Sequence, residues 1–310
     1  MGGMTWSDDS YRSFSSKVAS SHVDDIFKQN KSRSISDDMD PKNIKIRECR
    51  DSNVHPNTQG IVVALDVTGS MGMIPERMVR ETLPNLMKTL IENNQPDAQV
   101  LFIAIGDHYS DSYPLQVGQF ESGTDELIKW LTSTYLEGKG GGQIRESYSL
   151  AWLLASQYIS MDCFEKRGQK GLLFTIGDEA FHEKLERDAL KKIFGSNQEL
   201  DLNSVDLLRS AERMFDVFHL HCVNGSYGKK SDIVQPWAKI LGERLIFVED
   251  TNKIPEIIAS TVAIFNQIGL DTVTQSFDDS TALVVRNAVG HLVPKSESGI
   301  SKEAVGAGTL

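Results

Sequence analysis

Short apolar runs alternate with longer amphipathic stretches along most of this chain. The runs at 61–65 and 172–176 are composed mainly of aliphatic and aromatic residues, which is typical of strands buried on both faces. Between such runs, apolar residues recur every three or four positions, as in helices that cover a sheet. Strands are expected at 61–65, 99–105, 115–120, 172–176, 217–223 and 244–248.

Helices are expected between most of these strands, at 75–93, 125–135, 146–161, 182–194, 203–214, 233–241 and 254–268. Pro84 falls inside the first helix and predicts a kink or a break there. The strand at 115–120 follows its predecessor too closely for a crossover helix, so this pair should be antiparallel. The pattern therefore predicts an α/β fold with a doubly wound, mostly parallel sheet and one antiparallel edge strand.

The same pattern divides the chain into four segments. These are a polar N-terminal arm (1–42), a lead-in segment (43–59), the α/β domain (60–268) and a C-terminal extension (269–310) with a mobile tail. A further short strand is expected at 281–285. Arg47, Arg50, Asp51 and His55 crowd the lead-in segment, which is either a solvated connection or a segment folded back near a functional site.

Composition narrows the class of protein. The net charge of −11 comes without a basic patch, which argues against nucleic-acid binding. The three cysteines are widely spaced and odd in number, which favours a reducing compartment over a disulfide framework. No apolar run approaches the ~20 residues of a membrane-spanning helix, and the N-terminus lacks the pattern of a secretory signal. We therefore expect a cytoplasmic protein with no membrane partner.

The strand at 61–65 ends in a turn that carries three oxygen-bearing side chains. Asp66, Thr68 and Ser70 stand at alternate positions, and Pro75 then begins a helical pattern. One carboxylate with two hydroxyls suits a hard cation that keeps several waters, so Mg²⁺ is favoured, with Mn²⁺ and Ca²⁺ as alternatives. A capped helix entry is the simpler interpretation. However, an aspartate that ends a buried strand is costly unless it is paired or bound to metal.

Two more aspartates follow predicted strands. Asp107 comes after the strand at 99–105, and Asp178 comes after the strand at 172–176. Open parallel sheets bind ligands outside the carboxyl ends of their strands, where the strand order switches. Asp66 and Asp178 should therefore share one edge of the sheet, with Asp107 close by if its strand neighbours the first.

The DxTxS spacing of Asp66, Thr68 and Ser70 resembles the metal-ion-dependent adhesion site of von Willebrand factor A domains. The glycine-rich loop at 138–142 stands where that family carries its second metal loop, and Asp178 stands where it carries the aspartate of the third. The phrases GDHYSD and FTIGDE resemble a bacterial and phage-borne branch of the family. The resemblance spans 60–268 and implies a Rossmann-like fold with a Mg²⁺ site. It also implies a protein partner whose Asp or Glu carboxylate binds the metal.

Two positions depart from the pattern of that family. Gln143 replaces the usual threonine ligand, although an amide oxygen can bind Mg²⁺ directly or through water, and Glu146 and Ser147 are nearby substitutes. Glu179 stands where many relatives have glycine and adds a carboxylate. The expected metal ligands are Asp66, Thr68, Ser70, Gln143 and Asp178, with Asp107, Glu146 and Glu179 around them.

Three functions are compatible with these residues. The first is an intracellular binding module, not an enzyme, that engages an acidic residue of a protein partner through Mg²⁺. The second is a metal-dependent hydrolase in which the carboxylates of Asp107, Asp178, Glu179 and Glu146 hold two cations and activate water. The third is an assembly component with a vestigial metal site.

Other polar pairs are better explained without a ligand. His219 and His221 alternate on a predicted strand and face one side, but no third zinc ligand lies close in sequence. Asp107, His108 and Asp111 come without the serine of a nucleophile elbow. We therefore expect the former pair to be buried strand residues and the latter group to form a hydrogen-bonded turn.

Overall fold

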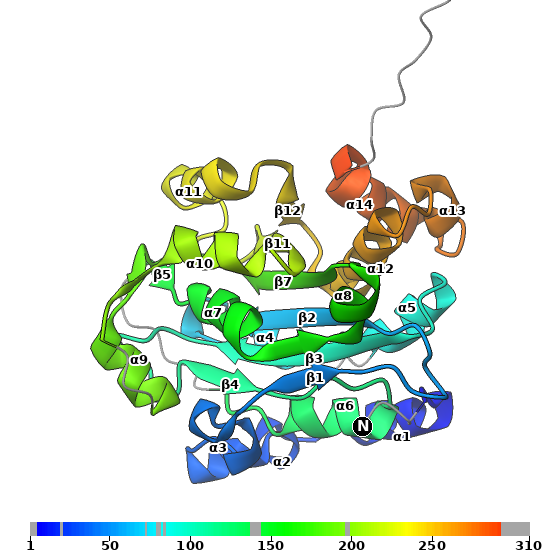
Figure 1. Ribbon diagram of the computed structural model, residues 1–310. Helices are drawn as coiled ribbons and strands as arrows, with labels where there is room; N and C mark the ends of the chain where they lie inside the picture. Colours follow the sequence, from blue (N-terminus) through cyan, green and yellow to red (C-terminus); the bar gives the residue numbers. More distant parts are fainter. Residues whose placement is uncertain are drawn as a thin grey trace, which may run out of the picture.

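A computed structural model describes residues 5–18, 21–71, 73–78, 82, 85–136, 144–195 and 199–292. A six-stranded sheet forms the centre of the molecule, with helices on both of its faces (Figure 1). Its strands are β2 (Gln59–Asp66), β3 (Ala98–Ile105), β4 (Leu115–Val117), β7 (Gly171–Gly177), β11 (Phe215–Cys222) and β12 (Leu245–Val248).

The strand order across the sheet is β12-β11-β7-β2-β3-β4. All neighbours pair in parallel except β4, which runs antiparallel to β3 with Ile103 opposite Val117. The predicted fold class, a mostly parallel α/β sheet with one antiparallel edge strand, is therefore confirmed. The short connection before β4 leaves no room for the crossover that a parallel neighbour needs.

Residues of β2 alternate between two hydrophobic layers, because successive side chains of a strand point to opposite faces. Ile61, Val63 and Leu65 belong to one layer, while Val62 and Ala64 belong to the other. All five side chains are buried. Because β2 is buried on both faces, its sequence is a continuous run of apolar residues and does not alternate between apolar and polar residues.

Each layer is completed by its own helices. The first contains α4 (Ile74–Arg77), α5 (Leu86–Glu92), α6 (Thr124–Thr132), α12 (Ile254–Phe265) and α14 (Asp279–Val289). The second contains α7 (Ser149–Gln157), α8 (Asp162–Arg167), α9 (Arg187–Phe194), α10 (Ser204–Ala211) and α11 (Ser231–Leu241). The remaining helices are α1 (Asp8–Val18), α2 (Val23–Ile26), α3 (Lys28–Ser32) and α13 (Leu270–Thr274).

Short 3-10 helices and two-stranded sheets complete the structure. The 3-10 helices include η1 (Asp37–Met39), η2 (Pro41–Asn43), η3 (Gly69–Met71), η6 (Gly242–Arg244), η7 (Thr251–Lys253) and η8 (Gly290–Leu292). The small pairs are β1 (Arg47–Cys49) with β6 (Ile159–Met161), β5 (Arg145–Glu146) with β8 (Ala180–Phe181), and β9 (Lys184–Leu185) with β10 (Leu202–Asn203).

The helix predicted at 146–161 is wrong at both ends. Glu146 belongs to β5, and the helix itself ends at Gln157, before β6 begins. β6 pairs in parallel with β1. Ile159 and Met161 are buried in the same layer as α7, so their apolar character alone did not distinguish a strand from a longer helix.

The strand predicted at 281–285 is also wrong, since these residues lie inside α14. Asp278 caps this helix and accepts hydrogen bonds from the backbone N–H groups of Ser280 and Thr281. Val285 and Val289, four residues apart, are buried against the first layer. The β-branched residues suggested a strand, but the cap and the helical spacing of the buried residues decide the structure.

Two helices, α4 and α5, occupy parts of the region 75–93 that was predicted as one helix. Pro84, where a kink or break is predicted, lies outside the described residues. The boundaries of the four predicted segments stay a prediction. Within the N-terminal arm, Phe27 is fully buried in the first layer.

The lead-in segment lies at the amino ends of the strands. Arg50 donates hydrogen bonds to Asp162 and Glu165, and the His55 ring approaches Asp97, which immediately precedes β3. The hypothesis that this segment folds back near the predicted metal site is therefore wrong, because the residues predicted for that site follow the opposite, carboxyl ends of the strands.

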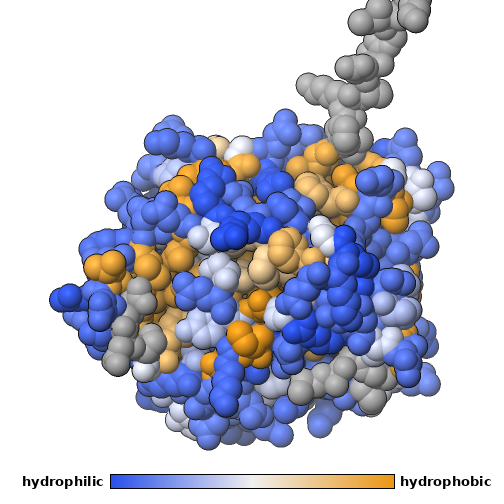
Figure 2. Space-filling view, viewed as in Figure 1, coloured by the Kyte–Doolittle hydropathy of each residue, from blue (hydrophilic) through white to orange (hydrophobic). Residues whose placement is uncertain are grey.

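The face shown in Figure 2 is largely hydrophilic, and its hydrophobic residues form several separate groups. Within the described part of the chain, every helix is too short or too polar to cross a membrane.

Candidate metal centre

The carboxyl ends of β2 and β7 lie side by side where the sheet changes its direction of winding. β3 and β4 lie on one side of β2, whereas β11 and β12 lie beyond β7. A crevice at such a switch point is the usual ligand site of an open α/β sheet. Asp66 is the last residue of β2, and Asp178 directly follows the last residue of β7. The two aspartates thus reach the same edge, as the sequence predicts.

The Asp66 carboxylate is fully buried and accepts three hydrogen bonds, two from Thr68 and one from Tyr148. Its Oδ1 accepts hydrogen bonds from the backbone N–H of Thr68 at 2.9 Å and from the Thr68 hydroxyl at 2.6 Å. Its Oδ2 accepts a hydrogen bond from the Tyr148 hydroxyl at 3.0 Å. These contacts fix the position of the carboxylate within its own loop.

Ser70 connects the first loop to Asp178. Its hydroxyl donates to Asp178 Oδ1 at 2.9 Å and lies 3.3 Å from the Thr68 hydroxyl. The backbone N–H of Tyr227 donates to Asp178 Oδ2 at 2.9 Å. The structure therefore brings four predicted ligands together, although their role in binding metal stays a prediction.

Two glycines allow this close approach. A Cβ atom at Gly177 would lie 1.8 Å from the Tyr148 hydroxyl oxygen and 3.0 Å from Asp66 Oδ2. A Cβ atom at Gly225 would lie 2.4 Å from Asp178 Oδ2. Any larger residue would push the carboxylates or Tyr148 out of place, so the site needs glycine at both positions.

Glu146 and Glu179 add two buried carboxyl groups to the same edge. Each is only 3% exposed. Within the described residues, Glu146 Oε2 and Glu179 Oε2 receive no hydrogen bond. A buried oxygen without a partner is costly, and native proteins seldom leave one unexplained.

Burial and mutual repulsion shift the titration of this group. Burial raises the pKa of Asp66 to about 7, and the charge of Asp178 adds to the increase, although Thr68 opposes it with its hydrogen bonds. Burial likewise raises the pKa of Glu179 to about 8 and that of Glu146 to about 11, with repulsion from Asp66 contributing to both. Without a cation these buried carboxyl groups therefore hold their protons at a pH where exposed carboxyls are ionised.

A hard divalent cation fits this set of donors. Carboxylates, hydroxyls and water are the ligands that Mg²⁺ prefers. The orphaned oxygens of Glu146 and Glu179 point to a positive charge as the missing partner. Gln143 lies outside the described residues, so its role as a ligand stays a prediction. Glu146, named above as a substitute for it, lies in β5, and repulsion from Asp66 helps to raise its pKa.

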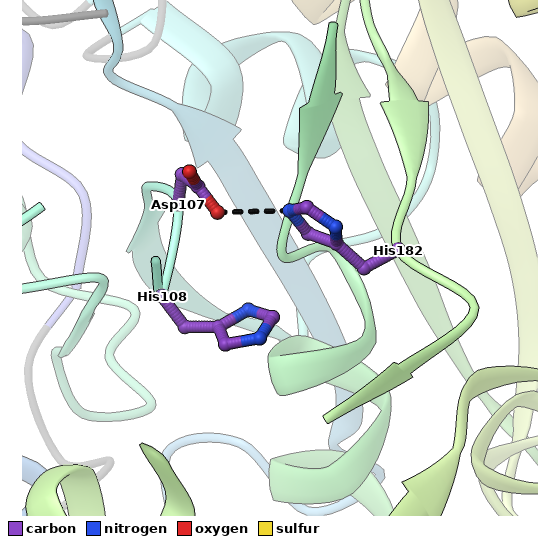
Figure 3. Close-up of side chains that lie close together, drawn as sticks. All are labelled: Asp107, His108 and His182. Atoms are coloured by element: carbon purple, nitrogen blue, oxygen red, sulfur yellow. Dashed lines mark hydrogen bonds and ion pairs between the residues drawn. The ribbon is translucent and has the colours of Figure 1, made fainter. Parts of the chain in front are cut away.

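A second polar cluster lies beside the first. Asp107 follows β3 and His182 follows β8, and the His182 Nε2 atom lies 2.8 Å from Asp107 Oδ1 (Figure 3). His108 contacts Glu186 through Nε2 at 2.7 Å and Ser147 through Nδ1 at 2.6 Å. The predicted hydrogen-bonded turn is present, since Asp111 Oδ2 accepts from the backbone N–H of Asp107.

Sequence reasoning missed His182. It stands four residues after Asp178, and the short strand β8 separates the two residues. A two-residue strand leaves no periodic signal, so the pattern gave no reason to expect this histidine beside Asp107. Only the pairing of β8 with β5 brings it there.

His219 and His221 are buried strand residues, in agreement with the prediction. His219 stacks on Trp237 with ring centroids 3.7 Å apart, and its Nδ1 lies 2.9 Å from the Thr175 hydroxyl. The Nε2 atom of His221 lies 2.8 Å from the carbonyl oxygen of Gly228.

Comparison with known proteins adds little to this description. No family model matches the chain, and no curated relative matches it. The chain is similar to the pilus adhesin SpaC from Lactobacillus rhamnosus GG in its open conformation, with a TM-score of 0.45 and 11% identity over 73% of this chain. It covers 31% of that adhesin, about a third of its length. The chain is also similar to the conserved hypothetical protein BatB from Bacteroides thetaiotaomicron, with a TM-score of 0.41 and 16% identity over 67% of this chain and 99% of BatB.

Proposed function

We propose that this protein is a binding module that uses Mg²⁺ at the edge between β2 and β7 to engage an acidic residue of a protein partner. Asp66, Thr68, Ser70 and Asp178 are the proposed residues of the site, and Glu146 supports them from β5, the strand that follows the glycine-rich loop. The resemblance to von Willebrand factor A domains motivates the proposal. Its support in the structure is the convergence of these loops at the switch point of the sheet.

The observation that carries the proposal is a group of buried carboxyl groups that have no cationic partner within the described residues. Asp66 and Asp178 are fully buried, and the carboxyl groups of Glu146 and Glu179 each contain an oxygen without a partner in the described part of the chain. Bound Mg²⁺ would supply a positive charge and an electrophilic position for an incoming carboxylate. Hydroxyls at Thr68 and Ser70 leave that position more electrophilic than additional carboxylates would.

The protein's own residues prepare this position. Thr68 and Tyr148 orient the Asp66 carboxylate, and the Tyr227 backbone N–H orients Asp178. Ser70 holds the two loops together through its hydrogen bond to Asp178. The ligands are therefore largely preorganised, so binding of the ion costs little rearrangement.

We further propose that the protein acts inside the cell. Cys49, Cys163 and Cys222 are all free and buried, as in proteins of a reducing compartment. Burial raises the pKa of the Cys163 thiol, and the same effect acts on Cys49 and Cys222, so none of the three is a reactive thiolate.

Calorimetric titration with Mg²⁺ tests the metal site directly. The Asp66→Asn variant keeps the shape of the side chain but loses a charged ligand, so we expect its affinity for Mg²⁺ to fall about 100-fold or more. Asp188→Asn is the matched control, because this aspartate is 78% exposed on α9. Equal affinity in both variants would refute the site.

Affinity capture from the native host tests the partner. The full chain should retain a protein in Mg²⁺, release it in EDTA and regain it when Mg²⁺ is restored. The Asp66→Asn bait should capture none of that protein in any buffer. A bait that binds Mg²⁺ but captures no EDTA-sensitive protein would contradict the proposed role while leaving the metal site intact.

A further inference from the structure

We propose that Asp107, His108 and His182 form a second metal site, which binds a divalent transition metal such as Zn²⁺ rather than Mg²⁺. This site goes beyond the function proposed above and does not depend on it. It uses different residues and ligand atoms of a different kind.

The three side chains converge from two separate loops. Asp107 and His108 follow β3, whereas His182 follows β8 (Figure 3). One potential ligand atom from each residue lies within 4.8 Å of those from the other two. Ligands of a tetrahedral Zn²⁺ ion, each about 2.0–2.2 Å from the metal, lie roughly 3.3–3.6 Å apart. Rotamer adjustments of about an ångström would close this cluster around an ion.

The surroundings hold the side chains in this arrangement. The His108 side chain is fully buried, with Glu186 against Nε2 and Ser147 against Nδ1. Metal binding through one ring nitrogen would displace one of these partners, and the other would then hold the ring. A carboxylate or hydroxyl in that position orients a metal-binding histidine and increases its basicity.

The charge around the cluster also favours a cation. Glu146 Oε2, a buried oxygen that receives no hydrogen bond within the described residues, belongs to β5, the strand that pairs with β8 just before His182. The Asp107 carboxylate accepts hydrogen bonds from the backbone N–H of Tyr109 and the Ser110 hydroxyl and contacts the His182 ring, but within the described residues it has no ion pair with a lysine or arginine. A metal ion bound by Asp107 and His182 would replace their direct contact and would bring positive charge to this acidic region.

The two imidazoles of His108 and His182, together with the Asp107 carboxylate, favour a transition metal over Mg²⁺. Imidazole nitrogen suits Zn²⁺, Co²⁺, Ni²⁺ and Fe²⁺, whereas Mg²⁺ prefers oxygen. Three protein ligands also leave a coordination position for water or another ligand. His182 lines a surface cavity of about 360 Å³ together with Tyr109, Arg145 and Lys184, which gives an ion a path to the site.

Titration of the metal-free full chain with Co²⁺ tests the second site. A nitrogen-rich, four- or five-coordinate Co²⁺ ion absorbs visible light strongly, and added Zn²⁺ should abolish this absorption by competition. We expect His182→Gln to lower the Co²⁺ affinity at least tenfold. His22→Gln, whose side chain is 71% exposed, is the matched control and should bind as the unmodified protein does.

The Asp66→Asn variant tests whether the two proposed metal sites are independent of each other. The second site should keep its Co²⁺ absorption in this variant, while Mg²⁺ binding at the first site is lost. Equal Co²⁺ binding by the His182→Gln and His22→Gln variants would overturn the proposal, and so would loss of the absorption in Asp66→Asn. If His182→Gln does not give the circular dichroism of a folded chain, His108→Gln takes its place with the same expected loss.

Discussion

Acidic side chains at the two ends of the central sheet differ in their partners: those at the amino ends of the strands pair with lysine and arginine, whereas those at the carboxyl ends do not in the described residues. At the amino ends of the strands, Asp51 accepts a hydrogen bond from Arg167 at 2.7 Å. Asp162 accepts hydrogen bonds from Arg50 at 2.9 Å and from Lys166 at 2.7 Å. At the carboxyl ends, the described residues place no lysine or arginine in an ion pair with Asp66 or Asp178.

The titration behaviour of the two ends differs accordingly. Burial opposes ionisation at both ends. Around Asp51 and Asp162 the cationic donors outweigh burial and hold the pKa of each carboxyl below its usual range. Burial instead raises the pKa of Asp66 to about 7 and that of Glu179 to about 8. The carboxyl end therefore lacks the cationic donors that the amino end has, and this difference is the basis of the proposed Mg²⁺ site.

The largest expected effect is a loss of stability with rising pH in the absence of metal. The folded chain keeps protons on Asp66 and Glu179 that the unfolded chain releases near their ordinary pKa values of 3.8 and 4.5. Stability should therefore fall as the pH rises from about 4 to about 8, by on the order of a few kcal/mol. Urea unfolding in EDTA at several pH values measures this change.

Two controls show whether the loss of stability with rising pH comes from these carboxyl groups. Mg²⁺ should remove most of the loss at about pH 8, because the ionised carboxylates then have a partner. The Asp66→Asn variant should lose less stability than the unmodified chain between about pH 4 and 8. A metal-free chain whose stability is the same at both ends of that range would contradict the contrast between the two ends of the sheet.

A smaller effect is expected from Glu146→Gln. The substitution keeps the size of the side chain and removes its charge, so affinity for Mg²⁺ should fall about tenfold. The metal-free variant should become more stable than the unmodified chain at neutral pH, because the unfolded chain no longer gains from ionising this residue. Calorimetry and urea unfolding measure the two quantities. The exposed Glu243→Gln variant should change neither, and identical behaviour of the two variants would remove Glu146 from the site.

The smallest effect concerns the opposite end of the sheet. Arg167→Ala removes a donor to Asp51 and to the carbonyl oxygen of Thr58, and should lower the free energy of unfolding by about 1–2 kcal/mol. The affinity for Mg²⁺ should stay unchanged. Arg187→Ala, which removes an exposed side chain on α9, should cost less than about 0.5 kcal/mol. A change in Mg²⁺ affinity on losing Arg167 would show that the two ends are coupled.

The sequence by itself determined the class of fold and the position of the turn that carries Asp66, Thr68 and Ser70. Apolar runs such as that of β2 report burial on both faces, and the brief connection before β4 forces an antiparallel neighbour. Asp66, Thr68 and Ser70 are close because they are adjacent in the chain. The relation to Asp178 was also predictable, because strand ends in a parallel sheet share an edge.

Only the tertiary structure determines where the short strands form and which distant polar residues come into contact. The strands β5, β6 and β8 exist because a distant segment offers them a partner, and two or three residues are too few to show a period. For the same reason the sequence did not reveal His182 beside Asp107, nor the unpartnered oxygens of Glu146 and Glu179. Such contacts depend on where the backbone turns in space, whereas the apolar pattern records only which residues are buried.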